Sequence, residues 1–466
     1  MRPRTRIPAA VLAPALAAAL AFAAASPAAP SPQAAKAAAK PATARLEAYI
    51  EAFNSGSLDR MKTFFEEHFA ASALKDTPVP RRLVRYQAGK LQLKSFEVDR
   101  VVAELPYQTS ILTKAGNGEI ILLKATVEKN PPHKLVSLMA DRVDDPEALN
   151  PPDPKANEAE LAAAVRGLLE AKAAADEFSG VVLVARNARV VFHEAYGLAD
   201  RDTKVLNRKD TRFNLGSINK NFTRVAVHQL AKRGKLALDD TIAKFLPDYP
   251  NAEAARKVTV RHLLNMTSGI GDFFGDRYDA APKESILALK DYLPLFADLP
   301  LEFEPGTANR YSNGGYVVLG LIIEKASGTD YYAYVRENIF KPCGMAATDS
   351  YPRDAGTPNL ALGYTREGAG EAGPVLNHAT LPGRGSSAGG GYSTTADLLK
   401  YVLALREGKI VLPDASAGLG IAGGAPGINA TVEWDPRTGW IVIVLANLDP
   451  PAAGAVSRQI VAWLPL

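Results

Sequence analysis

The segment Gly216-Ser217-Ile218-Asn219-Lys220 contains the residues whose types and spacing best suit chemistry. It follows an extended stretch and precedes apolar residues at helical spacing, which predict a helix over residues 221–233. Because Ser217 and Lys220 are three residues apart at a helix start, their side chains should lie on one face. A serine hydroxyl becomes a nucleophile when a base takes its proton, and a lysine is such a base when burial lowers its pKa. The helix N-terminus also brings backbone N–H groups to the reacting centre.

On its own, this pair is better explained by a serine that caps the helix and a lysine in solvent. A second polar segment, Tyr311-Ser312-Asn313-Gly314, favours the catalytic interpretation. A tyrosine beside a lysine can exchange protons with it, and Asn313 offers both a donor and an acceptor to a substrate amide. Taken alone, Tyr311 would also fit a buried aromatic residue whose hydroxyl is hydrogen-bonded.

Together these segments resemble the serine β-lactamase and penicillin-binding-protein superfamily, particularly its esterase and class C-like branch. The resemblance covers residues 171–466 and is supported, in the family's order, by residues 178–185, 260–270, 340–345 and 389–394. It implies that Ser217 is the nucleophile, Lys220 its base, Tyr311 an acid/base relay and Asn313 a substrate contact. The implied reaction is acyl transfer to Ser217, followed by hydrolysis.

The third element of the family pattern is altered in this chain. The family has a Lys or His on a strand at the sheet edge, followed by glycines, but Ile421 stands at that position in residues 420–427. The connection before this stretch, residues 411–420, is also short. The missing cation would help to bind substrate carboxylates and to keep Tyr311 and Lys220 poised. If the strand keeps its register, Gly424 still offers its backbone N–H to an oxyanion, beside that of Ser217.

Two functions therefore stay open. The first is a serine hydrolase of esters or amides, such as β-lactams, D-alanyl peptides or small carboxylic esters. The second is a catalytically silent relative that binds peptidoglycan-like ligands or a partner protein, which the change at Ile421 favours. The intact Ser217, Lys220, Tyr311 and Asn313 favour the first.

Other motifs do not compete with this interpretation. Residues 385–389 match the Gly-x-Ser-x-Gly nucleophile elbow around Ser387, but all six histidines precede Ser387, whereas the elbow fold needs its histidine afterwards. The glycines from residue 383 onward also resemble a dinucleotide-binding fingerprint, but no strand precedes them. We therefore predict that the chain binds no cofactor. These glycines are expected to form a glycine-rich floor beside the site. The histidines are scattered and Cys343 is the single cysteine, which argues against a metal site and excludes an intramolecular disulfide. His262 is expected to be a core or capping residue.

The order of the helices and strands that must position these residues predicts an α+β, β-lactamase-like domain over residues 157–466. A helix over residues 158–173 precedes two strands, and two further strands and a helix close the chain. Strands at both ends of a mostly helical segment predict one antiparallel sheet built from both ends. The predicted strands are residues 180–185, 190–196, 428–434 and 440–446.

A smaller α+β domain is predicted over residues 45–143, with helices broken at Asn54-Ser55-Gly56 and then a meander of strands over residues 91–101, 108–113, 120–128 and 135–140. Its order resembles a nuclear-transport-factor-two-like cone, and an accessory or spacer role is expected. An Ala/Pro-rich linker, residues 26–44, precedes it, and a Pro-rich linker, residues 144–156, follows it.

Residues 1–25 have the layout of a secretory signal peptide, with three early arginines, an apolar run and small residues at its end. An uncleaved membrane anchor is the alternative. We expect a periplasmic or secreted chain without a stable membrane span. Removal of the three arginines lowers the formal net charge from +4 to +1, which argues against a nucleic-acid partner. The expected partner is a small-molecule or peptidoglycan-derived substrate.

Overall fold

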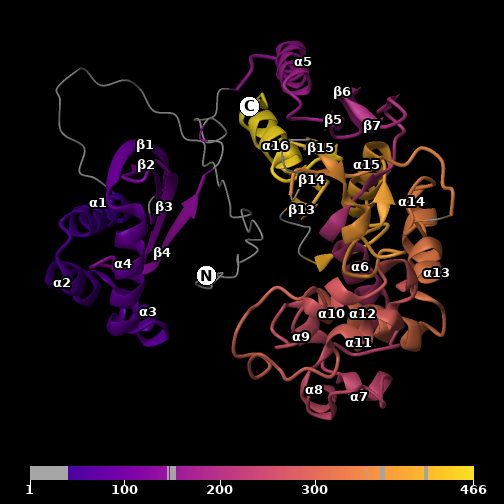
Figure 1. Ribbon diagram of the computed structural model, residues 1–466, viewed down its shortest axis with the longest axis horizontal. Coiled ribbons are helices and arrows are strands. Elements are labelled where there is room, and N and C mark those ends of the chain that lie inside the picture. Colours follow the sequence, from indigo (N-terminus) through magenta and orange to yellow (C-terminus); the bar gives the residue numbers. More distant parts are fainter. Residues whose placement is uncertain are drawn as a thin grey trace, which may run out of the picture. The chain divides into compact units, whose positions relative to one another are not determined.

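The computed structural model of the 466-residue chain describes two compact units. The described residues are 40–105, 107–143, 146, 154–353, 355–367, 373–413 and 418–465. One unit falls within Ala21–Asp153 and the other within Pro154–Leu466 (Figure 1). The predicted signal peptide, its anchor alternative and most of both predicted linkers lie outside the described residues. Within those residues, no helix is long and apolar enough to cross a membrane.

The N-terminal unit consists of helices followed by an antiparallel sheet. The helices are α1 (Pro41–Asn54), α2 (Leu58–His68), α3 (Ala71–Asp76) and α4 (Val79–Leu93). The strands β1 (Phe96–Leu105), β2 (Gln108–Ala115), β3 (Ile120–Val127) and β4 (Leu135–Arg142) pair in that order. The core of this unit lies between α1 and the sheet, where Leu46 and Phe53 are buried with Ile111 and Leu123. Burial of such side chains is the main force that holds the helix against the sheet.

One strand prediction in this unit is wrong at its start. Residues 91–93 were expected to begin the strand over residues 91–101, but they form the last turn of α4. Leu91 and Leu93 alternate as in a strand, yet Leu91 is 84 % exposed and packs on no sheet. The helix ends at Leu93 and is followed by the capping residue Lys94, which has a φ of 64°. The strand begins at Phe96, whose backbone N–H and carbonyl both bond the Asn54 side chain, at 2.8 and 2.7 Å.

The C-terminal unit is built on a five-stranded antiparallel sheet in the order β13-β14-β15-β5-β6. Strands β5 (Gly180–Arg186) and β6 (Arg189–Tyr196) come from the start of the unit. Strands β13 (Leu419–Ala425), β14 (Ile428–Trp434) and β15 (Trp440–Ala446) come from its end. The two groups meet where β15 pairs with β5, with Ile443 opposite Leu183. This confirms the prediction of an α+β fold with one sheet formed from both ends.

Helices cover both faces of this sheet. On one face, α5 (Glu158–Ala174) and α16 (Ala452–Trp463) bury Leu161, Val165 and Ile460 against the strands. The larger core lies on the other face, with α6 (Asn219–Lys232), α12 (Asn313–Ser327) and α15 (Thr395–Arg406). The remaining short elements of this unit are β7 (Leu198–Asp200), β8 (Val205–Leu206), β9 (Phe213–Asn214), α7 (Ile242–Phe245), α8 (Ala252–Lys257), α9 (Val260–Leu264), α10 (Asp276–Ala280), α11 (Leu293–Phe296), α13 (Tyr331–Val335), α14 (Lys341–Cys343), β10 (Tyr364–Thr365), β11 (Val375–Leu376) and β12 (Tyr392–Ser393).

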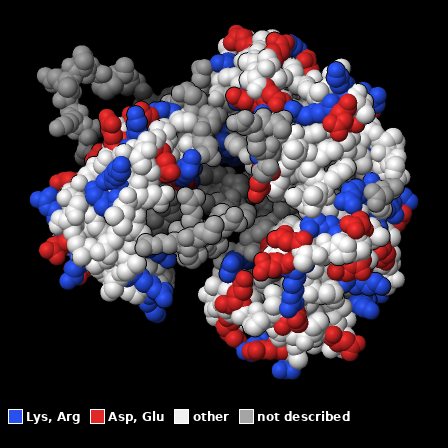
Figure 2. Space-filling model, in the orientation of Figure 1, with Lys and Arg blue, Asp and Glu red and all other residues white. Residues whose placement is uncertain are grey.

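Acidic and basic side chains are interspersed over the face shown in Figure 2. Many charged side chains of the described residues form exposed ion pairs, such as Arg277 with Asp298 at 2.5 Å and Arg261 with Asp239 at 2.8 Å. Exposed pairs of this kind contribute about 0–1 kcal/mol each. Ser217, Lys220 and Asn313 are therefore positioned by the packed elements of the larger core. They lie at the N-termini of α6 and α12.

Candidate active site

Ser217 lies in a 3₁₀ turn, Gly216–Ile218, that leads directly into α6. The turn is held by its neighbour Asn214, whose side-chain oxygen accepts the Gly216 N–H at 2.9 Å. Gly216 has a φ of +49°, a conformation that favours glycine. A Cβ at Gly216 would also lie 3.0 Å from the backbone nitrogen of Gly424, so the turn sits directly against the edge strand β13.

Lys220, in the first turn of α6, is 5 % exposed and points at the serine. Its Nζ donates to Ser217 Oγ at 3.1 Å, to Asn313 Oδ1 at 2.7 Å and to the Ala388 carbonyl at 2.5 Å. Burial lowers the pKa of Lys220 to about 7, although the charge of Asp272 acts in the opposite direction. A substantial fraction of Lys220 is therefore neutral at physiological pH and able to accept a proton.

Tyr311 completes the surroundings of the serine. Its hydroxyl forms a hydrogen bond with Ser217 Oγ. Burial raises the pKa of Tyr311 to about 12, so the hydroxyl keeps its proton at neutral pH. The Lys220 Nζ lies 4.6 Å from the centre of the Tyr311 ring. Ser217 Oγ thus contacts both groups that are able to move its proton.

Asn313, the first residue of α12, contacts Lys220 rather than open solvent. Ser312 caps the helix and accepts the Gly315 N–H at 2.8 Å, which fixes the start of α12 at Asn313. The other end of the Asn313 amide donates to Asp272 Oδ2 at 2.7 Å. Sequence reasoning missed Asp272. It follows residues 260–270, which carry part of the family resemblance, but no spacing in the chain links it to Ser217.

Strand β13 brings its glycines, and not a cation, to the turn that carries Ser217. Gly424 pairs with Asn429 and Ile421 pairs with Val432. Ile421 is half-buried and packs against the larger core. A Cβ at Gly423 would lie 2.0 Å from the Leu215 carbonyl oxygen, so only glycine allows this approach of strand and turn.

The glycine-rich segment around Ser387 forms the floor of the site. Ser387 is fully buried, and its Oγ donates to the Tyr316 carbonyl at 2.8 Å. Its own carbonyl accepts the Thr223 hydroxyl at 2.7 Å. The neighbouring Ala388 carbonyl is one of the acceptors of Lys220. The Gly-x-Ser-x-Gly pattern is therefore a packed support for Lys220, and Ser387 is not exposed as a nucleophile.

The family assignment follows from the comparison with known proteins. The model of the Beta-lactamase family matches residues 162–420, more than half of the chain. The chain belongs to the beta-lactamase family. It is thereby placed among serine hydrolases that include penicillin-binding proteins and esterases.

Individual relatives are similar over different shares of their length. Penicillin-binding protein 4* of Bacillus subtilis (strain 168) is 35 % identical over 179 residues, which are 38 % of this chain and 39 % of that protein. Esterase EstB of Burkholderia gladioli is 30 % identical over 312 residues, 60 % of this chain and 78 % of EstB. The crystal structure of a penicillin binding protein from Bacillus halodurans has a TM-score of 0.58 and 29 % identity, and covers 64 % of this chain and 99 % of that one. The chain thus aligns with less than half of penicillin-binding protein 4*.

Two other candidate residues, His262 and Cys343, have structural roles in this member of the beta-lactamase family. His262 closes a capping box on α9, in which Thr259 Oγ1 accepts the His262 N–H at 3.2 Å. Cys343 is buried, and burial raises the pKa of its thiol to about 11, which leaves it a poor nucleophile. Among the described residues, no group of three or more His, Cys, Asp and Glu side chains is arranged to hold a metal ion.

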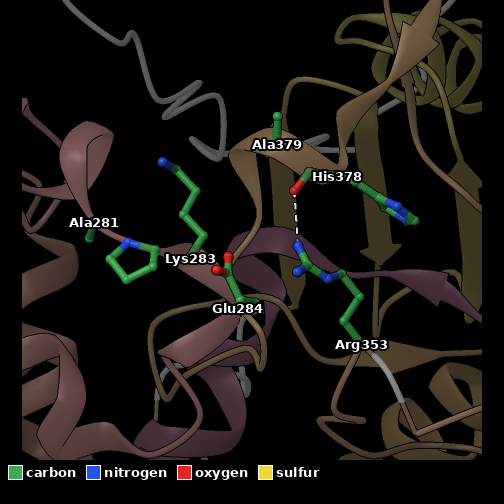
Figure 3. Close-up of a pocket in the computed structure, with 7 residues that line it drawn as sticks. Ala281, Lys283, Glu284, Arg353, His378 and Ala379 are labelled. Atoms are coloured by element: carbon green, nitrogen blue, oxygen red, sulfur yellow. Dashed lines mark hydrogen bonds between the residues drawn. The ribbon is translucent and has the colours of Figure 1, made fainter.

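A surface cavity of about 460 Å³ lies between residues 281–284 and the segments around Arg353 and His378 (Figure 3). The Arg353 guanidinium donates to the His378 carbonyl at 3.1 Å across its wall. Lys283 Nζ donates to the Asp279 carbonyl at 3.1 Å. The lining contains neither Ser217 nor any residue that contacts it, so the cavity is distinct from the candidate site around Ser217.

Proposed function

We propose that this chain is an active serine hydrolase that works through an acyl-enzyme on Ser217 and prefers uncharged esters. One observation carries the proposal. Ser217 Oγ is 3.1 Å from the Nζ of a buried lysine and is also bonded to the Tyr311 hydroxyl. A serine with a base and a proton relay in contact has what nucleophilic catalysis requires. A silent binding protein would have no need of a lysine whose pKa is lowered to about 7.

In the acylation step, neutral Lys220 takes the proton of Ser217 while Oγ attacks the carbonyl carbon of the ester. The carbonyl electron pair moves onto oxygen and forms a tetrahedral oxyanion. Collapse of this intermediate expels the alcohol oxygen, which receives the proton of Lys220 either directly or through the Tyr311 hydroxyl, which takes the lysine proton as it gives up its own. Water then repeats the sequence on the acyl-enzyme, with the same base, and releases the acid.

The oxyanion would be bound by the backbone N–H groups of Ser217 and Gly424. The support for this is the close approach of the two backbones, since a Cβ at Gly216 would lie 3.0 Å from the Gly424 nitrogen. Removing one donor of such a pair costs about 10²–10³ in turnover in hydrolases of comparable design. This makes the contact between turn and strand part of the machinery as well as of the fold.

The preference for uncharged substrates rests on the charges around Ser217. Ile421 replaces the cation that would pair with a substrate carboxylate, and Asp272 adds a carboxylate behind Asn313. A substrate with its own carboxylate would meet no cation on β13. The replacement of this cation by Ile421 also favours the second candidate, a catalytically silent relative that binds peptidoglycan-like ligands.

The test is hydrolysis of a nitrophenyl ester compared with hydrolysis of a chromogenic cephalosporin. Wild type should hydrolyse the ester and be much slower on the cephalosporin, and Ser217→Ala should hydrolyse neither. Ile421→His restores a cation on β13 and should raise the cephalosporin rate relative to the ester rate. Ester hydrolysis that survives Ser217→Ala, or none in wild type, would contradict the proposal.

We further propose that the chain is exported by the signal peptide of residues 1–25 and acts in the periplasm or outside the cell. The N-terminal unit would be the nuclear-transport-factor-two-like domain of residues 45–143, in an accessory or spacer role. Support comes from its helices followed by a four-stranded antiparallel meander. The hydrolase domain would be residues 157–466.

A further inference from the structure

The Asp272 side chain lies against the N-terminus of α12. It is hydrogen-bonded to Asn313, the residue that accepts a hydrogen bond from Lys220. Its Oδ2 accepts the Asn313 side-chain amide at 2.7 Å and the Asn313 backbone N–H at 3.4 Å. Its Oδ1 accepts the Phe274 N–H at 3.1 Å. The first turn of a helix favours a negative charge, so α12 stabilises the carboxylate in this position. Asp272 is therefore fixed by three N–H groups from two segments.

The loop that carries Asp272 is anchored to the same helix by a second set of contacts. Ser312 Oγ donates to the Gly271 carbonyl at 2.9 Å. A Cβ at Gly314 would lie 2.5 Å from the Gly271 carbonyl oxygen, so the loop and the helix are in close backbone contact. The distance between Asp272 and Asn313 is thus set by the fold and not by chance contact of two mobile side chains.

The Asn313 amide has one accepting end and one donating end, and the two have different neighbours. The oxygen faces Lys220 Nζ at 2.7 Å, and the nitrogen faces Asp272 at 2.7 Å. An ionised carboxylate only accepts hydrogen bonds. If the amide were rotated, its oxygen would face the carboxylate and its NH₂ group would face the lysine amine. Asp272 therefore selects the one orientation in which Asn313 accepts from Lys220.

We propose that Asp272 is a positioning residue for the hydrolysis at Ser217: it orients Asn313 so that Lys220 is held against Ser217 Oγ. The chain of contacts runs from Asp272 through Asn313 and Lys220 to Ser217. This inference rests on the proposed function, because it assigns a second role within the same site. It also explains why Asn313 serves the lysine here, in addition to any contact with substrate.

The electrostatic surroundings of Lys220 make this role measurable. The titratable groups that face its Nζ are Tyr311 from the segment before α12, Tyr316 from α12 itself and Asp272 from the loop before α10. The Tyr311 hydroxyl is neutral at working pH, because burial raises its pKa to about 12. Asp272 is the charge that raises the pKa of Lys220 against the effect of burial. Removal of this charge should lower the pKa of Lys220.

The experiment measures the rate of Ser217 labelling by a fluorophosphonate, followed by intact-protein mass, from about pH 5 to about pH 10. In Asp272→Asn the rate should fall about 10- to 100-fold, because the base is no longer held in place. The midpoint of the rise in rate with pH should move to lower pH. Asp272→Glu keeps the charge on a longer side chain, so its midpoint should stay near that of wild type while its rate falls.

Asp276→Asn is the matched control. Asp276 is an exposed acid four residues away on α10, and its loss removes the same charge from the surface. Its rate and midpoint should equal those of wild type. The inference is overturned if Asp272→Asn behaves like Asp276→Asn, or if its rate falls with an unchanged midpoint, which would indicate a structural role alone. Absence of labelling in wild type would instead reject the proposed function.

Discussion

In the proposed mechanism, the reactivity of Ser217 depends on how often Lys220 is neutral. An exposed lysine has a pKa near 10.4 and would be protonated almost completely at pH 7. Burial of the Lys220 amine among neutral acceptors lowers its pKa to about 7. In the proposed mechanism, this one side chain can therefore serve as the base at physiological pH.

This predicts the pH dependence of kcat/KM for ester hydrolysis. Because the base must be deprotonated, the rate should rise with pH, with a midpoint near 7, and then reach a plateau. The plateau should extend far into the alkaline range, since burial raises the pKa of Tyr311 to about 12 and its proton is retained. Lys220→Ala should abolish the rise. A rate that is flat from about pH 5 to about pH 9, or that falls with increasing pH, would contradict the role of Lys220.

Single residues were predictable where a short spacing encodes their geometry. Ser217 and Lys220 are one helical turn apart, so their contact follows from the local sequence. Tyr311 and Asn313 could be assigned only through the family resemblance, because their contact with Lys220 depends on tertiary packing. Asp272 is one acid among many, and nothing local indicates that it would reach α12.

At the scale of elements, the proposed site depends on the close approach of β13 to the turn that carries Ser217. Gly423 makes this approach possible, because any Cβ there would lie 2.0 Å from the Leu215 carbonyl oxygen and 2.8 Å from the Ser217 nitrogen. Neither of these backbone atoms is able to move without displacing Ser217 itself. The glycines after Ile421 therefore matter for their lack of a side chain.

Gly423→Ala should lower ester hydrolysis about 100-fold and destabilise the unit by about 1–3 kcal/mol, because β13 must shift away from the turn. Gly167→Ala is the control, since Gly167 lies inside α5 and a Cβ there meets nothing within 4 Å. That change should keep full activity and add about 0.5–1 kcal/mol of stability. The measurements are kcat and the free energy of unfolding in urea. Full activity in Gly423→Ala would show that the strand does not support the oxyanion.

Strands with buried, β-branched runs were predicted well, and β14 and β15 have the expected bounds. The register of β13 on β14, which sets Gly424 opposite Asn429, was not encoded in any local motif. The helix α4 was missed because Leu91 and Leu93 alternate like strand residues at its exposed end. The spacing of apolar residues alone does not distinguish the last turn of a helix from the start of a strand.

At the scale of the whole molecule, the two units have separate cores. The core of the N-terminal unit contains buried residues only between Ala42 and Leu135. The cores around the five-stranded sheet contain only residues from Leu161 onward. Ser217 and every described residue that contacts it belong to the second unit.

A chain that begins at Pro154 should therefore fold and keep the ester hydrolysis of the full chain, with the same midpoint in pH. Asn157 caps α5 close to this new start, which protects the first helix from fraying. Circular dichroism with heating and the kcat of the shortened chain provide the measurements. An insoluble or inactive product would show that the N-terminal unit is required for the fold or the chemistry, and not an accessory.

The central claim, that Ser217 is an activated nucleophile, is tested most directly by intact-protein mass after incubation with a fluorophosphonate. We predict one adduct on wild type, located on the peptide that contains Ser217, and none on Ser217→Ala. Ser387→Ala, which alters the buried serine of the glycine-rich floor, should be labelled like wild type. No adduct on wild type, or an adduct that persists in Ser217→Ala, would contradict the account.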